Sequence, residues 1–74
     1  MVSNLRVSFG KRLKILRVSK GMVQEELAEA AGISVDFLSL IERGRNSPSF
    51  ISIEKIAKAL DIPVKDLFDF DKLS

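Results

Sequence analysis

The chain has 74 residues, of which 46% are apolar and 30% are charged, and its net charge of +2 is that of one small folded domain. The sequence contains no histidine and no cysteine, which excludes disulfides and the usual zinc sites and removes the commonest catalytic bases and nucleophiles. No apolar run approaches the roughly 20 residues of a membrane span and no secretory signal is visible, so we expect a cytoplasmic protein with no enzymatic activity, metal or cofactor.

The spacing of the apolar residues predicts three helices in the first part of the chain. The first is expected over about 7–19. The second and third, over about 24–31 and 35–42, are separated by a three-residue turn around Gly32. Ser34 is well placed to cap the third helix, because a serine hydroxyl accepts from the free N–H groups of a first turn.

The remaining residues predict a polar loop and two further helices. Ser49 is placed to cap a fourth helix. One face of that helix carries an apolar stripe, made of Phe50, Ile53, Ala57 and Leu60. Pro63 suits the first turn of a fifth, short helix. Because no strand alternation is visible, we expect an all-α domain of five helices around one core, spanning residues 1–74.

Residues 24–43 have the form of a helix-turn-helix. Ala28 and Gly32 leave room for two helices to cross closely, and the second helix of such a motif can enter a DNA major groove. Basic residues lie on both sides of the motif: six among residues 1–20, where no residue is acidic, and then Arg43 and Arg45. This distribution favours a phosphate-contacting surface over an ordinary solvated helix face.

Four pieces of the chain form a specific signal in their order and spacing. They are Phe-Gly-Lys-Arg-Leu-Lys-Ile-Leu-Arg (9–17), Gln-Glu-Glu-Leu-Ala (24–28), Ile-Glu-Arg-Gly (41–44) and Ile-Ala-Lys-Ala-Leu (56–60). Together they resemble the Cro/repressor-like, or XRE-type, helix-turn-helix DNA-binding domains. The chain looks most similar to restriction-modification controller proteins, and small phage-type or plasmid repressors remain an alternative. The resemblance implies a five-helix lambda-repressor-like fold with the helix-turn-helix at about 24–42.

The resemblance also implies roles for matching positions. Gln24 would contact a phosphate. Base edges would be read from the recognition helix and its cap, at Ser34, Val35, Asp36, Phe37, Ser39 and Leu40. The following loop would contact the DNA backbone through Arg43, Arg45 and Asn46. Arg17 and Glu42 match a structural salt bridge, which is reasonable because a carboxylate at a helix end favours a cationic partner.

The chain departs from the family pattern in three places. Val23 stands where relatives carry a Ser or Thr cap, so only the Glu26 half of a capping box is available, at a cost of about 1 kcal/mol. The recognition face carries apolar residues and Asp36 instead of Arg, Gln or Asn, so direct base readout is expected to be weak or T-rich. Ser47-Pro48 lengthens the following loop and leaves the register of its phosphate contacts open.

The C-terminal residues carry more apolar side chains than one short helix buries in its own core. They are Ile62, Val64, Leu67, Phe68 and Phe70. This surplus and the resemblance predict a homodimer through residues 50–72, with two recognition helices about 34 Å apart. The expected function is a transcriptional regulator on a pseudo-palindromic double-stranded DNA operator, which would block or recruit RNA polymerase. No membrane and no small-molecule ligand is expected as a partner.

The alternative function is a helix-turn-helix fold used as a protein-interaction or antagonist module. The apolar, Asp36-bearing outer face and the missing cap at Val23 favour that alternative. The basic N-terminal helix and the two arginines after the recognition helix argue against it.

Overall fold

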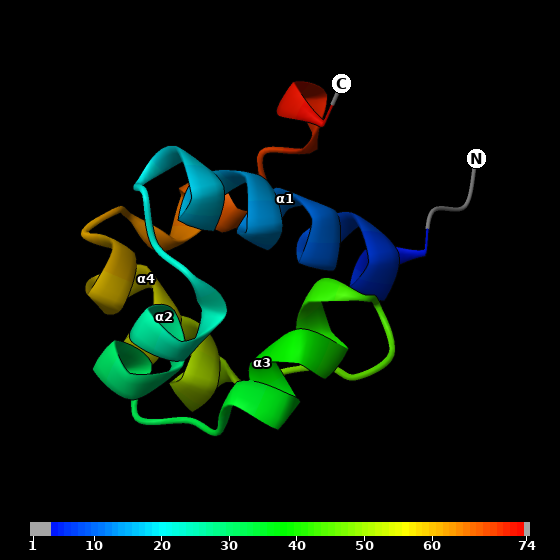
Figure 1. Ribbon diagram of the computed structural model, residues 1–74. Coiled ribbons are helices and arrows are strands. Elements are labelled where there is room, and N and C mark those ends of the chain that lie inside the picture. The colour runs from blue at the N-terminus through cyan, green and yellow to red at the C-terminus, as the bar shows by residue number, and fades with distance from the viewer. Residues whose placement is uncertain (1–3, 74) are drawn as a thin grey trace.

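The computed structural model describes residues 4–73, which form four α-helices followed by two short 3₁₀ helices (Figure 1). The α-helices are α1 (Leu5–Ser19), α2 (Gln24–Ala31), α3 (Val35–Glu42) and α4 (Phe50–Leu60). The 3₁₀ helices are η1 (Val64–Phe68) and η2 (Phe70–Lys72). No strand occurs in this part of the chain, so the expected all-α class is confirmed.

The expected fifth, short helix is not confirmed as an α-helix, because the segment after Pro63 forms the 3₁₀ helix η1. Its turns are closed over three residues: the Asp66 N–H donates to the Pro63 carbonyl (3.0 Å) and the Asp69 N–H to the Asp66 carbonyl (3.3 Å). Segments this short commonly adopt 3₁₀ geometry, since an α-helix gains few bonds before it ends. The tight turns place Leu67 in the core, where η1 packs against both α1 and α4.

The predicted caps at Ser34 and Ser49 are confirmed. The Ser34 hydroxyl accepts from the Phe37 N–H (3.0 Å), and the Ser49 hydroxyl accepts from the Ser52 N–H (3.1 Å). α1 begins two residues earlier than expected, because the Asn4 side chain caps it. These local bonds satisfy N–H groups that have no partner within their own helix.

One apolar core joins all four α-helices and η1. Seven of its side chains are almost completely buried: Leu13, Leu27, Leu38, Ile41, Ile56, Leu60 and Leu67. Phe50 was expected to share this core, but its side chain is 86% exposed. The inward face of α4 begins one turn later, at Ile53, because the first turn of α4 extends past the end of the core.

α1 lies across the C-terminal end of α3, and Gly10 is the point of closest approach. A Cβ atom at position 10 would overlap the Ile41 carbonyl oxygen and would lie 2.7 Å from the Glu42 carbonyl oxygen. Only glycine therefore allows α1 to rest directly on the last turn of α3. Figure 1 shows the result, with α1 crossing above α2 and α3. This contact fixes the direction in which α3 faces solvent.

Candidate nucleic-acid interface

The turn between α2 and α3 holds the two helices in the helix-turn-helix arrangement. Gly32 takes the left-handed conformation, with a φ of 71°, and the Ile33 N–H donates to the Ala28 carbonyl (3.0 Å). Ala28 and Ala31 are buried at the crossing, where small side chains permit close packing. Figure 1 shows α3 at the edge of the molecule, with its outer side uncovered by any other helix.

The outer surface of α3 is small and begins at its N-terminus. Val35 is 37% exposed, and Ser34 and Asp36 are also exposed. The other three residues expected there are only half-buried: Phe37, Ser39 and Leu40. Phe37 packs partly against the core, so its ring is less available than the sequence suggested. Of the predicted residues on the helix, Val35 and Asp36 are therefore the most accessible.

The loop after α3 presents two exposed arginines, Arg43 and Arg45. The loop is held in shape by its own bonds, because the Arg45 N–H donates to the Leu40 carbonyl (2.9 Å). The Asn46 side-chain oxygen Oδ1 accepts from the Ser47 N–H (2.9 Å), so this oxygen already has a partner. Among residues 4–73, neither arginine forms an ion pair with a carboxylate.

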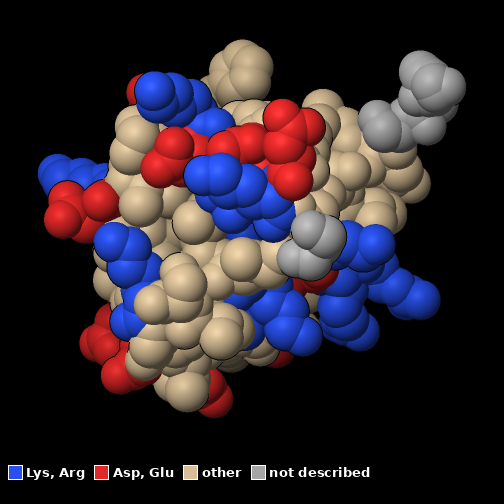
Figure 2. All heavy atoms as spheres, turned by 90° about the horizontal axis from the view of Figure 1, so that it is seen from above, with Lys and Arg blue, Asp and Glu red and all other residues tan. Residues whose placement is uncertain are grey.

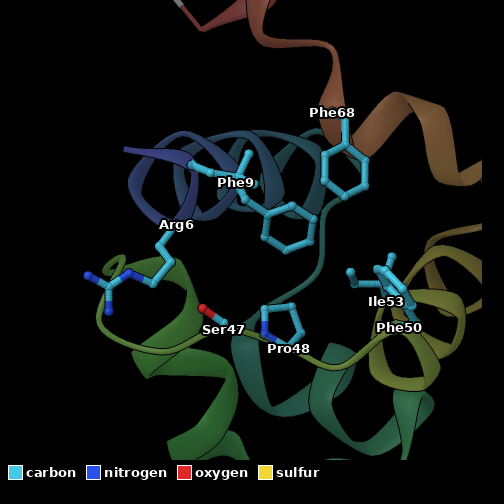
Figure 3. Close-up of a pocket in the computed structure, with 8 residues that line it drawn as sticks. Arg6, Phe9, Ser47, Pro48, Phe50, Ile53 and Phe68 are labelled. Carbon is cyan, nitrogen blue, oxygen red and sulfur yellow. The ribbon is translucent and has the colours of Figure 1, made fainter. Parts of the chain in front are cut away.

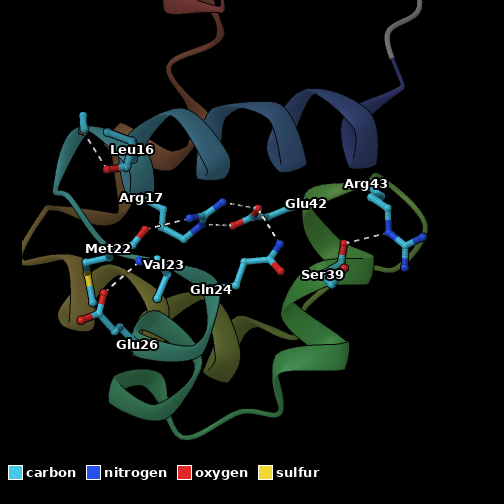
Figure 4. A network of polar contacts seen from close by, with 10 residues as sticks. Leu16, Arg17, Met22, Val23, Gln24, Glu26, Ser39, Glu42 and Arg43 are labelled. Atoms are coloured by element: carbon cyan, nitrogen blue, oxygen red, sulfur yellow. Dashed lines mark hydrogen bonds and ion pairs between the residues drawn. The ribbon is translucent and has the colours of Figure 1, made fainter.

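A buried polar network ties α1, α2 and α3 together (Figure 4). The Arg17 guanidinium donates to both carboxylate oxygens of Glu42, at 2.7 and 3.0 Å, and both residues are 8% exposed. Arg17 also donates to the Met22 carbonyl (2.7 Å). Bidentate geometry of this kind is the strongest form of a charge-assisted hydrogen bond. The ion pair therefore fixes α1 against the end of α3.

Gln24 joins the same network, although the resemblance implied a phosphate contact for it. Its side-chain amide donates to Glu42 (3.0 Å), and Figure 4 shows the side chain directed toward that carboxylate. Gln24 also opens α2, where the first main-chain N–H groups have no partner within the helix. Gln24 is thus hydrogen-bonded to the same Glu42 carboxylate that pairs with Arg17.

Arg12 is a buried residue whose structural role sequence reasoning missed. It is 6% exposed, and its Nε donates to the Asp66 carbonyl (2.8 Å), which ties α1 to η1. The sequence interpretation counted Arg12 among the basic residues of a phosphate-contacting surface, but its side chain is buried. Arg17 is also buried, in the salt bridge with Glu42 that the resemblance implied. Helical spacing gave a signal, since Arg12 follows the core residue Phe9 by three positions and precedes buried Leu13.

The C-terminal apolar residues divide into a buried and an exposed set. Leu67 was expected at the dimer interface, but it is fully buried within one chain and therefore belongs to the core. Val64 and Phe68 are 41% and 38% exposed, and Ile62 and Phe70 are half-buried. The sequence analysis placed Phe50 on the apolar face of the fourth helix and did not name Ile51. These two side chains are the most exposed apolar ones in this region, at 86% and 64%.

An apolar groove lies between the start of α1, the loop before α4 and η1 (Figure 3). Its volume is about 180 Å³. The lining residues are Leu5, Arg6, Phe9, Ser47, Pro48, Phe50, Ile53 and Phe68. The ring centroids of Phe9 and Phe68 lie 5.2 Å apart, and these two rings form part of the groove lining. No carboxylate lines this groove.

Figure 2 shows the charges on one face of the molecule, seen from the side of α1. Acidic side chains gather in a band with Lys and Arg side chains beside it, and a further group of Lys and Arg side chains lies toward the end where the chain begins. No helix within residues 4–73 is long and apolar enough to cross a membrane. The same residues contain no group of side chains suited to hold a metal ion.

We expect a hydroxyl at position 23 to stabilise the domain. The Glu26 carboxylate accepts from the Val23 N–H (2.9 Å), so one half of a capping box is present, but valine cannot supply the other half. Because Val23 is 55% exposed, Val23→Thr should raise the free energy of unfolding by about 1 kcal/mol. Thermal denaturation measures the gain, with Val23→Ala as the control; equal melting temperatures for the two variants would contradict it.

Comparison with known proteins places this arrangement in a family. The helix-turn-helix family model HTH_3 matches residues 13–67. Control protein C.BamHI of Bacillus amyloliquefaciens is 44% identical over 71 residues, which cover 95% of this chain and 88% of that protein. The HTH-type transcriptional regulator SinR of Bacillus subtilis is 43% identical over 61 residues, covering 81% of this chain and 55% of SinR, so the chain spans about half of SinR.

A solved structure agrees with the sequence comparisons. The crystal structure of the restriction-modification controller protein C.AhdI from Aeromonas hydrophila has a TM-score of 0.84 and 43% sequence identity to this chain. The match covers 85% of this chain and 96% of C.AhdI. The resemblance to XRE-type domains is therefore confirmed, and the chain belongs to the helix-turn-helix family HTH_3.

Proposed function

We propose that this chain is a DNA-binding transcriptional regulator that binds a pseudo-palindromic operator as a homodimer. The observation that carries the proposal is the uncovered edge of α3, held rigidly by the Arg17–Glu42 pair and bordered by Arg43 and Arg45. The relatives named above are a control protein, a controller protein and a transcriptional regulator, which supports the same function. Operator occupancy would block or recruit RNA polymerase according to where the operator lies relative to a promoter.

The proposed contacts divide between the bases and the phosphates. α3 would enter the major groove, where Val35 would contact a thymine methyl group and Asp36 would accept from a cytosine amino group. Arg43 and Arg45 would pair with phosphates, while Asn46 and the main-chain N–H groups at Gln24 would add neutral contacts. Because so few polar side chains reach the bases, DNA deformability would carry much of the specificity.

The proposed dimer surface is the exposed apolar set around the start of α4 and η1, within residues 50–72. Phe50, Ile51, Val64 and Phe68 remain exposed beside the apolar groove, where a second copy would cover them. Fully burying an apolar side chain of this size contributes about 1.5–3 kcal/mol. Phe50 would supply the largest share, since it is the most exposed of them. The dimer would space two α3 helices by about 34 Å.

A gel-shift titration tests the proposal with DNA from the region upstream of the chain's own gene. We expect a shift that weakens steeply with salt, because each phosphate contact adds about 0.9 to the slope of log K against log salt. Arg43→Gln with Arg45→Gln should flatten that slope by about 1.8 and weaken specific and unrelated duplexes alike. Lys58→Gln is the control. Lys58 is exposed on the last turn of α4, beside Ala31 and Gly32, and so does not belong to the loop that carries Arg43 and Arg45.

Two outcomes would contradict the proposal. If the unmodified chain gives no shift even at about 50 mM salt, DNA binding is wrong and the protein-interaction alternative stands. If the double arginine variant binds with the slope of the Lys58→Gln control, the assigned phosphate surface is wrong. Analytical ultracentrifugation of Phe50→Ser tests the dimer. A sedimentation coefficient equal to that of the unmodified chain at each protein concentration would contradict the proposed interface.

A further inference from the structure

We propose that Arg6, in the first turn of α1, is an additional phosphate-binding residue that forms one basic edge with Arg43 and Arg45. The proposal rests on the DNA binding proposed above and names a contact outside the helix-turn-helix. Along the sequence, Arg6 and Arg43 are separated by half of the chain length. The fold brings the two segments together.

The contact that joins them lies between Val7 and Gly44. A Cβ atom at position 44 would lie 2.9 Å from the Val7 Cγ2 atom and 3.0 Å from the Val7 Cα atom. The loop that carries Arg43 and Arg45 therefore rests directly on the first turn of α1. Gly44 has a φ of 73°, a conformation that glycine adopts easily. The residue at the centre of the basic edge is thus the one that allows the close approach.

A second observation places Arg6 at the same edge. Arg6 of α1 and Ser47 of the loop line the same groove. Figure 3 shows the Arg6 guanidinium extending outward past the loop that follows α3, away from the apolar lining. The side chain is exposed, and no hydrogen bond or ion pair within residues 4–73 involves it. Its charge is therefore available to an external partner.

The edge is basic because two segments without acidic residues meet there. Residues 1–24 and residues 43–53 contain no Asp or Glu. Glu42, which directly precedes the loop in the sequence, is already paired with Arg17 in the interior. Figure 2 shows Lys and Arg side chains grouped at this end of the molecule. None of the three arginines forms an ion pair within residues 4–73, although the Arg43 Nε donates to the Ser39 carbonyl (3.4 Å). Cations without a carboxylate partner suit a polyanion, because their mutual repulsion is relieved when phosphates lie between them.

The geometry points to the DNA backbone as that polyanion. Arg43 follows directly on α3, so a duplex that receives α3 in its major groove would bring a phosphate strand past Arg43 and Arg45. Arg6 extends this line beyond the loop, toward the start of α1. One arginine guanidinium group can donate two parallel hydrogen bonds to the oxygens of one phosphate, which suits a fixed contact along the strand.

The test measures binding of Arg6→Gln to two labelled duplexes of equal length, the upstream fragment and a scrambled sequence. We expect the slope of log K against log salt to flatten by about 0.9, and affinity at 0.1 M salt to fall about 8-fold on both duplexes. Arg6→Lys should keep the slope, because it keeps the charge. Lys58→Gln, which removes the same charge elsewhere, is the matched control, and circular dichroism verifies that each variant is folded.

Three results separate this proposal from the proposed function. If Arg43→Gln flattens the slope while Arg6→Gln behaves as Lys58→Gln, the Arg6 contact is wrong and DNA binding stands. If Arg6→Gln weakens only the upstream fragment, Arg6 reads sequence and the phosphate assignment is wrong. If the unmodified chain binds neither duplex at about 50 mM salt, the proposed function fails and this contact fails with it.

Discussion

Replacing Glu42 by alanine is expected to lower the free energy of unfolding by about 3–5 kcal/mol. The substitution leaves Arg17 charged, 8% exposed and without its two short hydrogen bonds to the carboxylate. It also removes the acceptor of the Gln24 amide. Because a domain of this size has a core worth only about 3–5 kcal/mol, we expect most of the Glu42→Ala protein to be unfolded at room temperature.

Urea denaturation followed by circular dichroism measures this loss. Glu54→Ala is the control, since Glu54 is an exposed glutamate on α4 and takes part in neither ion pair found in residues 4–73. That variant should stay within about 0.5 kcal/mol of the unmodified chain. Equal midpoints for Glu42→Ala and Glu54→Ala would show that the buried pair does not stabilise the fold.

The double variant Arg17→Met with Glu42→Leu separates stability from DNA binding. Apolar replacement of a buried ion pair is often neutral or stabilising, so we expect the double variant to fold although the single variant does not. The double variant also frees the Gln24 amide from its partner. If its DNA affinity matches that of the unmodified chain, the Arg17–Glu42 pair is purely structural; a loss of affinity in the folded variant would show that the pair positions the end of α2.

Replacing Gly10 by alanine is expected to lower the free energy of unfolding by about 3 kcal/mol. Alanine is the better helix former by about 1 kcal/mol, so propensity alone would predict a more stable protein. The added Cβ, however, overlaps the Ile41 carbonyl and lies 2.7 Å from the Glu42 carbonyl. These are main-chain atoms of α3, which cannot turn away as a side chain could. α1 must therefore move off α3, and Arg17, two turns along, would be drawn away from Glu42.

Thermal and urea denaturation of Gly10→Ala measure the net effect of propensity and overlap. Val18→Ala is the control on the same helix, because Val18 is 57% exposed and its replacement changes propensity without creating a contact. A Gly10→Ala protein that is as stable as the Val18→Ala control would contradict the close contact between α1 and α3.

Local features of the fold could be read from the sequence because they depend on neighbours along the chain. The four α-helices follow from apolar residues at helical spacing, and Ser34 and Ser49 cap helices through bonds that span three residues. Arg17 and Glu42 were paired through resemblance to a family, since nothing in the spacing of 25 residues between them indicates contact.

Other features depend on which elements meet, and the sequence predicted them incorrectly. Phe50 continues the apolar stripe of α4 in the sequence. In the structure, however, α4 extends past the core at that turn and the Phe50 ring is exposed. The charge of Arg12 suggested an exposed side chain, yet the side chain is buried and its Nε donates to the Asp66 carbonyl of η1. In each case the partner lies on another element.

The sequence by itself thus determined the helices, the helix-turn-helix between Gln24 and Arg43, and the family. The tertiary structure decided which charges and apolar side chains remain free for a partner. The physical reason is that periodicity and capping report interactions within one helix, whereas exposure depends on the packing of one helix against another. The basic edge shows this most plainly, because Arg6 and Arg43 become neighbours only when Gly44 lets the loop rest on Val7.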